Sequence, residues 1–274
     1  MDGARPVIDV AEIATAKLSI DSRRLPMQPG ARVLDVGCGD GRHIVEAARR
    51  GGYAVGLDYD ACELAKARER GGGLSIDLLV GDATRLPFRD GAFDGVICTE
   101  TFEHLRDDSG AMREIGRVLS AAGVLLGAVP SHFTELVFWR LSRGYWNTPG
   151  GHVRIYRPRE LARRLGDAGL RPTSMQYVHF IDSLVWLRFC LTDYLRPTRP
   201  ASDFEAAVLL AVAAERPVQR WRSRLRAAMG TSRFISLVDA VGALVWPKSL
   251  SFVAQKGRLP APHHNSVAAA EKSG

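Results

Sequence analysis

Apolar and polar positions follow two alternating rhythms along the first two-thirds of the chain. Short runs rich in Val, Leu and Ile predict buried strands, and segments with apolar residues three and four positions apart predict helices between them. The expected strands are the runs at 32–37, 53–58, 75–81, 93–99 and 123–130, and the expected helices are those at 41–50, 60–70 and 111–120. This alternation is typical of a parallel sheet with helices on both faces, in which ligands bind at the carboxyl ends of the strands.

From residue 131 onward the regular alternation of strands and helices is lost. Residues 131–157 are aromatic and rich in glycine, which predicts a long loop on the substrate side. A helix is expected over 157–170 and a strand over 174–180, followed by about 65 mostly helical residues and a last strand over 248–257. The expected organisation is an N-terminal helical segment (1–29), a core (30–179), a helical cap on the acceptor side (180–246), the final strand of the core (247–258) and a disordered tail (259–274).

Composition and charge narrow the class of protein. The 274 residues carry a net charge of +7. The segment 177–260 holds twelve basic and six acidic residues, so most of the net positive charge lies in this segment. No apolar run is long enough to span a membrane, and the N-terminus does not resemble a signal peptide. The four cysteines are widely spaced, which predicts reduced thiols rather than a disulfide framework or a cysteine zinc site. We therefore expect a cytoplasmic enzyme, and the arginine- and alanine-rich composition suggests a bacterial one.

The stretch "VLDVGCGDGRH" places three glycines, Gly37, Gly39 and Gly41, directly after the first strand. Glycines there allow a sharp turn and a close approach of the backbone to a ligand at a helix start. The third glycine comes one position too early for the dinucleotide fingerprint, and there is no P-loop lysine. Each of the first three expected strands has an acidic residue in it or directly after it. Asp35 lies in the first strand, Asp58 ends the second and Asp82 follows the third.

These residues carry a resemblance. The motifs "DVGCGDG", "GLDYD", "GDATRLPF" and "EHL" occur in the order and spacing of the class I S-adenosylmethionine-dependent methyltransferases, including the ubiquinone-biosynthesis-like group. The resemblance is close over residues 30–130 and weaker through the final strand. It implies an α/β, Rossmann-like, doubly wound and mostly parallel seven-stranded sheet with a helical insertion before the last strand, and S-adenosylmethionine as cofactor, with S-adenosylhomocysteine as product.

The resemblance also implies a role for each matching position. Asp35 would lie near the amino end of the methionine, with Gly37, Cys38 and Gly39 forming a backbone wall. Asp58 would accept both ribose hydroxyls and Tyr59 would lie against the adenine. The remaining cofactor positions would be Asp82 and Ala83 at the adenine amine and Thr99 near the sulfonium.

Candidate catalytic residues follow from the chemistry. Methyl transfer to a hydroxyl requires a nucleophile that is held in place and loses its proton. Glu103 and His104 follow the fourth strand, and His152 lies in the aromatic loop; each could also be an ordinary structural residue. Glu100, Glu103 and His104 form an E-x-x-E-H pattern similar to one that holds a divalent ion in ubiquinone-biosynthesis O-methyltransferases, but "EHL" also occurs in metal-independent relatives, so a divalent metal is not favoured.

The acceptor is predicted from the cap. Apolar residues between 180 and 225 and the arginines at 216, 220, 222, 224 and 226 favour a lipid-like, isoprenoid, polyketide or glycolipid acceptor, methylated on oxygen, and a peripheral contact with the inner face of the membrane. An ordinary helical cap with a solvated basic face fits equally well. The alternatives are an RNA-directed methyltransferase or nucleic-acid-binding protein, although no RNA-binding module is visible, a cofactor-binding scaffold without catalysis, and a nicotinamide dehydrogenase.

Overall fold

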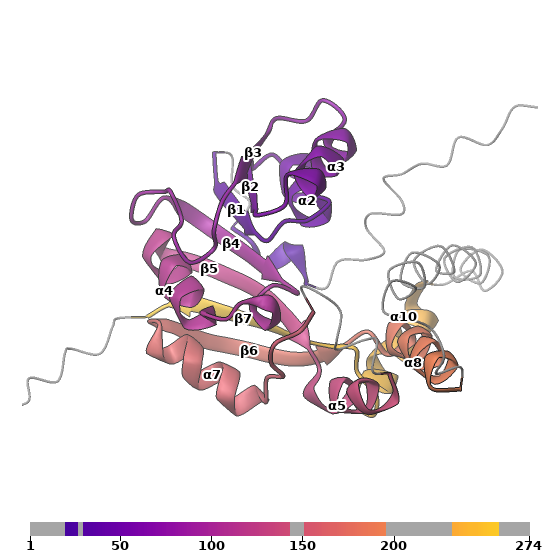
Figure 1. The fold of residues 1–274 in the computed structure, drawn as a ribbon. Coiled ribbons are helices and arrows are strands. Elements are labelled where there is room, and N and C mark those ends of the chain that lie inside the picture. Colours follow the sequence, from indigo (N-terminus) through magenta and orange to yellow (C-terminus); the bar gives the residue numbers. More distant parts are fainter. Residues whose placement is uncertain (1–19, 27–29, 143–150, 196–231, 258–274) are drawn as a thin grey trace, which may run out of the picture.

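The protein is built around a seven-stranded sheet (Figure 1). Its structure is a computed structural model, which describes residues 20–26, 30–142, 151–195 and 232–257. The strand order is β3-β2-β1-β4-β5-β7-β6, with β7 antiparallel to both of its neighbours and the other pairs parallel. The predicted mostly parallel, doubly wound α/β sheet is therefore confirmed. The strands are β1 (Arg32–Val36), β2 (Tyr53–Asp58), β3 (Ile76–Val80), β4 (Phe93–Thr99), β5 (Leu119–Pro130), β6 (Leu170–Val178) and β7 (Ser249–Lys256).

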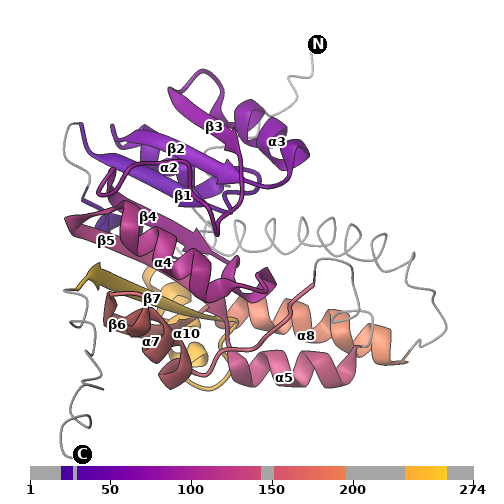
Figure 2. The same cartoon turned by 60° about the vertical axis from the view of Figure 1, so that its left-hand side comes forward.

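Helices cover both faces of the sheet, and a group of three extends beyond its edge. One face carries α4 and α7, the other carries α2 and α3, and α5 packs against α8, which packs against α10 (Figure 2). Two short 3-10 turns, η1 (Ser22–Arg24) and η2 (Phe102–His104), complete the described elements. The helices are α2 (Arg42–Arg49), α3 (Ala61–Gly71), α4 (Asp108–Val118), α5 (His132–Leu141), α7 (Pro158–Asp167), α8 (Phe180–Leu195) and α10 (Ser232–Ala243).

Two apolar clusters hold these layers together. Successive residues of a strand face opposite sides, so Val33 of β1 packs with Ile44 and Val45 of α2, whereas Leu34 packs in the cluster that holds Met112 and Ile115 of α4. All six side chains are fully buried. The continuous apolar runs that predicted these strands are explained by burial on both faces. The four cysteines are free, as the sequence predicted.

Three boundaries differ from the sequence prediction. The expected loop at 131–157 begins with α5, which Thr134 anchors by donating to the Pro247 carbonyl at 2.7 Å. The strand expected at 174–180 begins already at Leu170, because Gly169, with a φ of 76°, turns the chain directly from α7 into β6. The helix expected at 111–120 ends at Val118, since Leu119 already pairs with Phe93.

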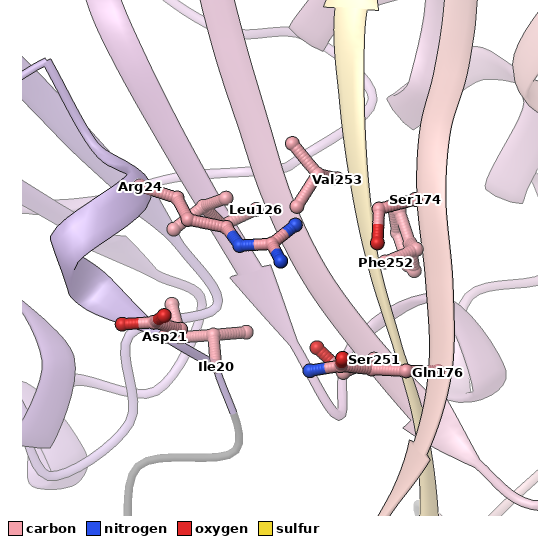
Figure 3. A pocket seen from close by; sticks show the side chains of 9 residues that line it. All are labelled: Ile20, Asp21, Arg24, Leu126, Ser174, Gln176, Ser251, Phe252 and Val253. Carbon is pink, nitrogen blue, oxygen red and sulfur yellow. The ribbon is translucent and has the colours of Figure 1, made fainter.

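The face of the sheet under η1 has a small polar hollow between β5, β7 and β6. Arg24 of η1 extends over it toward Ser174, Gln176 and Ser251 (Figure 3). This hollow lies apart from the strand ends at which ligands bind in such sheets.

Several predictions lie outside the described residues. They concern most of the N-terminal helical segment, the helical stretch and basic arginines between 196 and 231, and the C-terminal tail. Among the described residues, no helix is both long enough and apolar enough to cross a membrane.

Candidate functional site

A cleft of about 1120 Å³ opens at the carboxyl ends of β1, β2 and β4. Its walls come from the glycine turn after β1, the segments after β2 and β3, the residues after β4, and the start of α8 with the residues before β7. This is the edge at which the sequence predicted a ligand site.

The glycine turn is fixed to the neighbouring strand. The amides of Gly37 and Cys38 both donate to the Leu57 carbonyl, at 2.8 and 3.1 Å. Gly37 has a φ of 70°, and a Cβ there would lie 2.4 Å from Thr101 Oγ1, so only glycine fits. At Gly39 (φ 51°) nothing lies within 4 Å of such a Cβ, which leaves the backbone open toward a ligand.

Asp35 lies beneath this turn and is 1% exposed. Neither carboxylate oxygen has a hydrogen-bond partner in the described structure. Burial raises the pKa of Asp35 to about 7, against the opposing charge of Arg42. A buried acid without a partner is suited to a cationic ligand group, such as the ammonium of an amino acid, that would compensate its charge.

Asp58 ends β2 and ties two backbone segments together. Its Oδ2 accepts the Gly39 amide at 2.8 Å, and its Oδ1 accepts the Asp60 amide at 2.9 Å. Each carboxylate oxygen can accept a further hydrogen bond, so a pair of ligand hydroxyls can share this side chain. Tyr59 follows it, 81% exposed, on the same wall of the cleft.

Asp82 and Ala83 line the cleft after β3, and Thr99 lines it at the end of β4. Asp82 Oδ1 accepts both the amide and the hydroxyl of Thr84 at 2.8 Å, and these bonds lower the pKa of Asp82. The carboxylate is therefore an ionised acceptor whose Oδ2 atom is available for an amine. All predicted cofactor residues except Asp35 line one cleft.

At the opposite end of the cleft, Glu100 contacts Lys248 and Ser249, two residues that sequence reasoning missed. Ser249 Oγ donates to Glu100 Oε1 at 2.9 Å, and Lys248 Nζ lies 3.6 Å from Glu100 Oε2 and 5.5 Å from the ring centre of Trp186. Burial pushes the pKa of Glu100 upward, but the Lys248 charge holds it below its usual range. Lys248 and Ser249 are 148 positions or more away from Glu100, so no local pattern could have indicated this contact.

The backbone is strained at this end of the cleft. Among the described residues, Glu100 (φ 50°) and His179 (φ 67°) are the non-glycine residues with positive φ, and both line the cleft. Left-handed backbone at non-glycine residues is uncommon and concentrates at functional sites.

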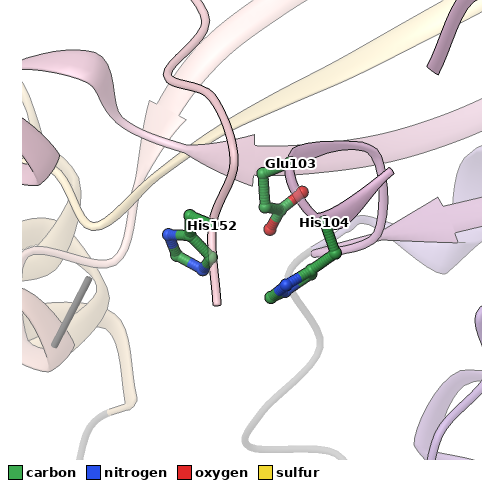
Figure 4. Close-up of side chains that lie close together, drawn as sticks. All are labelled: Glu103, His104 and His152. Atoms are coloured by element: carbon green, nitrogen blue, oxygen red, sulfur yellow. The ribbon is translucent and has the colours of Figure 1, made fainter. Parts of the chain in front are cut away.

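The three predicted catalytic residues come together. The ligand atoms of Glu103, His104 and His152 lie within 4.8 Å of one another, and Figure 4 shows the three side chains turned toward each other. The two imidazole rings meet edge to face, with centroids 4.8 Å apart. Of the three, His104 lines the cleft. Glu103 is fully buried, and neither of its carboxylate oxygens has a hydrogen-bond partner in the described structure.

Burial and the nearby Glu100 carboxylate raise the pKa of Glu103 well above its usual range.

Backbone contacts hold His152 against η2. The amide of Val153 donates to the Glu103 carbonyl at 2.8 Å, and Arg154 donates to the carbonyls of Leu105 and Arg106. Arg154 also pairs with Asp108 at the start of α4, with 2.7 Å between Nη1 and Oδ1. The segment after residue 151 is therefore fixed to the turn that carries Glu103 and His104.

Glu135 of α5 completes the cluster and was missed in the sequence. Its buried carboxylate bonds His152 Nδ1 and accepts from Trp139 Nε1 at 3.0 Å. The Nδ1 side of the His152 ring is therefore fixed against a buried carboxylate of α5. The expected loop across 131–157 hid this residue, since no helix was predicted there.

These features fit S-adenosylmethionine. The uncompensated Asp35 carboxylate suits its ammonium group, the open backbone at Gly39 leaves room for the methionine, and Asp58 and Asp82 can accept from the ribose and adenine. The match between this cleft and S-adenosylmethionine rests on the types of these residues and on their positions around the cleft.

Comparisons with known proteins agree with the fold. Residues 34–127 match the family described as "Methyltransferase domain". A demethylmenaquinone methyltransferase of Corynebacterium efficiens is 33% identical over 122 residues, which cover 44% of this chain and 51% of that protein. The match thus spans about half the length of this relative.

Solved structures are similar over most of the chain. One belongs to the complex between the Haloferax volcanii Trm112 methyltransferase activator and a methyltransferase, with a TM-score of 0.57, 20% identity, and coverage of 90% of this chain and 88% of that one. The [4+2]-cyclase SpnF has a TM-score of 0.55 at 21% identity, covering 90% of this chain and 80% of that one. At these identities the likeness concerns the fold.

Proposed function

We propose that this chain, which matches the family described as "Methyltransferase domain" over residues 34–127, is a class I S-adenosylmethionine-dependent methyltransferase that methylates a hydroxyl oxygen of a hydrophobic small molecule or lipid-like acceptor. The observation that carries the proposal is the single cleft lined by the glycine turn, Asp58, Asp82 and His104. Because a [4+2]-cyclase has a similar fold, the fold alone does not identify the reaction. The reaction has to be inferred from the residues of the cleft.

The cofactor end of the cleft binds and orients. Asp58 and Asp82 would hold the ribose and the adenine, the charge of Asp35 beneath the glycine turn would attract the ammonium group, and Thr99 would line the cleft near the methyl group. S-adenosylmethionine supplies a methyl group on a sulfonium, which is already a good leaving group. The task left to the protein is to place the acceptor oxygen in line and to deal with its proton.

The end of the cleft near His104 and Trp186, here called the acceptor end, offers groups for both tasks, which are to hold the acceptor and to remove its proton. Trp186 and Leu105 offer apolar surface beside His104, all three on the cleft wall. Several residues of α8 and α10 near this end are exposed and apolar, including Leu184, Leu191, Leu237 and Val241. An apolar acceptor also agrees with the name of the Corynebacterium efficiens relative, which acts on a demethylated menaquinone.

Proton removal is assigned to the cluster of Glu103, His104 and His152. The acceptor hydroxyl lies against His104, the member of the cluster that reaches the cleft. This cluster would take the proton of the hydroxyl when bound S-adenosylmethionine supplies its methyl group to the acceptor oxygen.

The test is transfer of a labelled methyl group from S-adenosylmethionine to components of a bacterial membrane lipid extract. We expect a labelled product that partitions into organic solvent and is stable to mild base, as an ether is. Label in RNA added in parallel would instead favour the nucleic-acid alternative. Cofactor binding with no product in any extract would favour the scaffold alternative.

Peripheral membrane contact through Arg220, Arg222, Arg224 and Arg226 forms part of the proposal on sequence grounds. Changing all four to Gln should reduce sedimentation with anionic phosphatidylglycerol vesicles and leave cofactor binding unchanged. Equal sedimentation of the two proteins would exclude this contact.

A further inference from the structure

We propose that Glu103, His104 and His152 form a transition-metal site of the catalytic zinc type, with Glu135 as its outer partner. The site differs from the Glu100, Glu103 and His104 set that the sequence pattern suggests. Glu100 is held by Ser249 and Lys248, and His152, 48 residues after His104, takes its place.

The donor set determines the class of ion. Two imidazoles and one carboxylate are the ligands of many catalytic zinc sites, in which a fourth position stays open for water or substrate. Magnesium and calcium ions prefer oxygen ligands throughout and do not match this set. Because His104 lines the cleft while Glu103 and His152 lie behind it, the open position would face the acceptor end.

The buried Glu103 carboxylate is the independent observation. It is fully buried, it has no hydrogen-bond partner for either oxygen, and it points toward the two imidazoles (Figure 4). An uncompensated buried carboxylate is costly, and a cation at this point would offset that cost.

Glu135 provides the support that a metal-binding histidine needs. Histidine ligands of metals commonly donate their second ring nitrogen to a carboxylate, which fixes the ring and directs the other nitrogen at the ion. The bond between Glu135 and His152 Nδ1 does this here, and Trp139 fixes the same carboxylate oxygen.

Only a small adjustment is needed for binding. Zinc–ligand bonds of about 2.0–2.1 Å place tetrahedral ligand atoms about 3.3 Å apart. The three ligand atoms already lie within 4.8 Å of one another, so metal binding would require them to approach by at most about 1.5 Å.

With the ion bound, His104 would be a ligand and would no longer accept the proton itself. The ion would instead lower the pKa of a hydroxyl that it coordinates, and the proton would leave to water in the cleft. This role in catalysis rests on the proposed function, whereas zinc binding itself does not.

The experiment measures zinc in the untagged full-length protein after saturation with Zn²⁺ and dialysis, by plasma mass spectrometry. We expect about one zinc per chain in the wild type and loss of this zinc in His104→Ala and His152→Ala. His132→Ala, which removes a partly buried histidine of α5 outside the cluster, is the matched control and should keep it. Glu135→Gln should weaken zinc binding about 10- to 100-fold in a chelator competition.

Substitution of Co²⁺ adds a spectroscopic measure, since a tetrahedral site gives visible absorption that should disappear in His152→Ala. Calorimetric binding of S-adenosylhomocysteine shows that each variant is folded. Equal zinc content in the wild type, His104→Ala and His152→Ala would overturn the site. Failure of the wild type to bind S-adenosylhomocysteine would contradict the proposed function while leaving the zinc result in force.

Discussion

The buried Glu135 carboxylate of α5 bonds Nδ1 of His152, whose ring in turn meets the ring of His104 at the cleft wall. Three separate segments thus meet at one point: η2 after β4, helix α5 after β5, and the segment that follows residue 151. The arrangement fixes the orientation of His152 before any ligand enters, and preorganised side chains of this kind are typical of catalytic sites.

His104→Ala should separate chemistry from cofactor binding. His104 is the member of the cluster that lines the cleft. Its removal should lower the rate of methyl transfer about 100-fold or more, because no group of the cluster would then be placed to assist loss of the acceptor proton. Calorimetric affinity for S-adenosylhomocysteine should stay within about twofold of the wild type. A variant that retained full transfer would show that the cluster takes no part in the reaction.

Cofactor affinity should depend on pH through Asp35. Burial raises the pKa of this side chain to about 7, so the folded protein holds it mostly protonated at pH 6 and mostly ionised at pH 8. The ionised form attracts the ammonium group of the ligand, so affinity for S-adenosylhomocysteine should rise about tenfold from pH 6 to pH 8.

Asp35→Asn is the control for this dependence. It should bind more weakly at pH 8 and show an almost flat profile, measured by calorimetry at matched ionic strength. A wild-type profile as flat as that of Asp35→Asn would rule out the proposed contact.

Gly37→Ala should destabilise the fold by about 2–4 kcal/mol. The new Cβ would lie 2.4 Å from Thr101 Oγ1 and would also occupy backbone of positive φ. Gly51→Ala is the matched control, since its φ of 87° carries the same strain but nothing lies within 4 Å of its Cβ. Urea unfolding should show the larger loss for Gly37→Ala, and equal losses would mean that packing against Thr101 is unimportant.

Tyr156→Phe should lower the free energy of unfolding by about 1–3 kcal/mol. The buried Tyr156 hydroxyl donates to Asp108 Oδ2 at 2.6 Å, and its loss would leave a buried carboxylate with one hydrogen bond fewer. Tyr53→Phe is the control, because Tyr53 is 46% exposed and its contact with Asp77 lies in solvent. Thermal or urea unfolding of both variants gives the comparison; equal effects would contradict the expected role of burial.

The sheet and the cofactor side of the cleft were predictable because their signals are local. The strands leave apolar runs, and Asp35, Asp58 and Asp82 lie within, at the end of or just after such a run. The positions of Asp58 and Asp82 in one cleft follow from parallel strands whose ends share an edge of the sheet.

The acceptor side was less predictable because its contacts join distant parts of the chain. The pairing of Lys248 with Glu100 and the bond from Glu135 to His152 depend on how α5, α8 and β7 pack, which leaves no periodic trace. The helix α5 was missed because its aromatic residues suggested a loop, although tertiary contacts such as that of Thr134 with Pro247 stabilise it.

The most direct measurement is calorimetric titration of the full-length protein with S-adenosylhomocysteine and with NAD. The account predicts that the first ligand binds and the second does not. Asp58→Ala should weaken binding at least about tenfold, because hydrogen bonds to a charged group contribute about 1.5–3 kcal/mol. Asp167→Ala, at an exposed position of α7, should bind like the wild type. Absence of S-adenosylhomocysteine binding, or equal binding by Asp58→Ala, would contradict the assignment of this cleft to the cofactor.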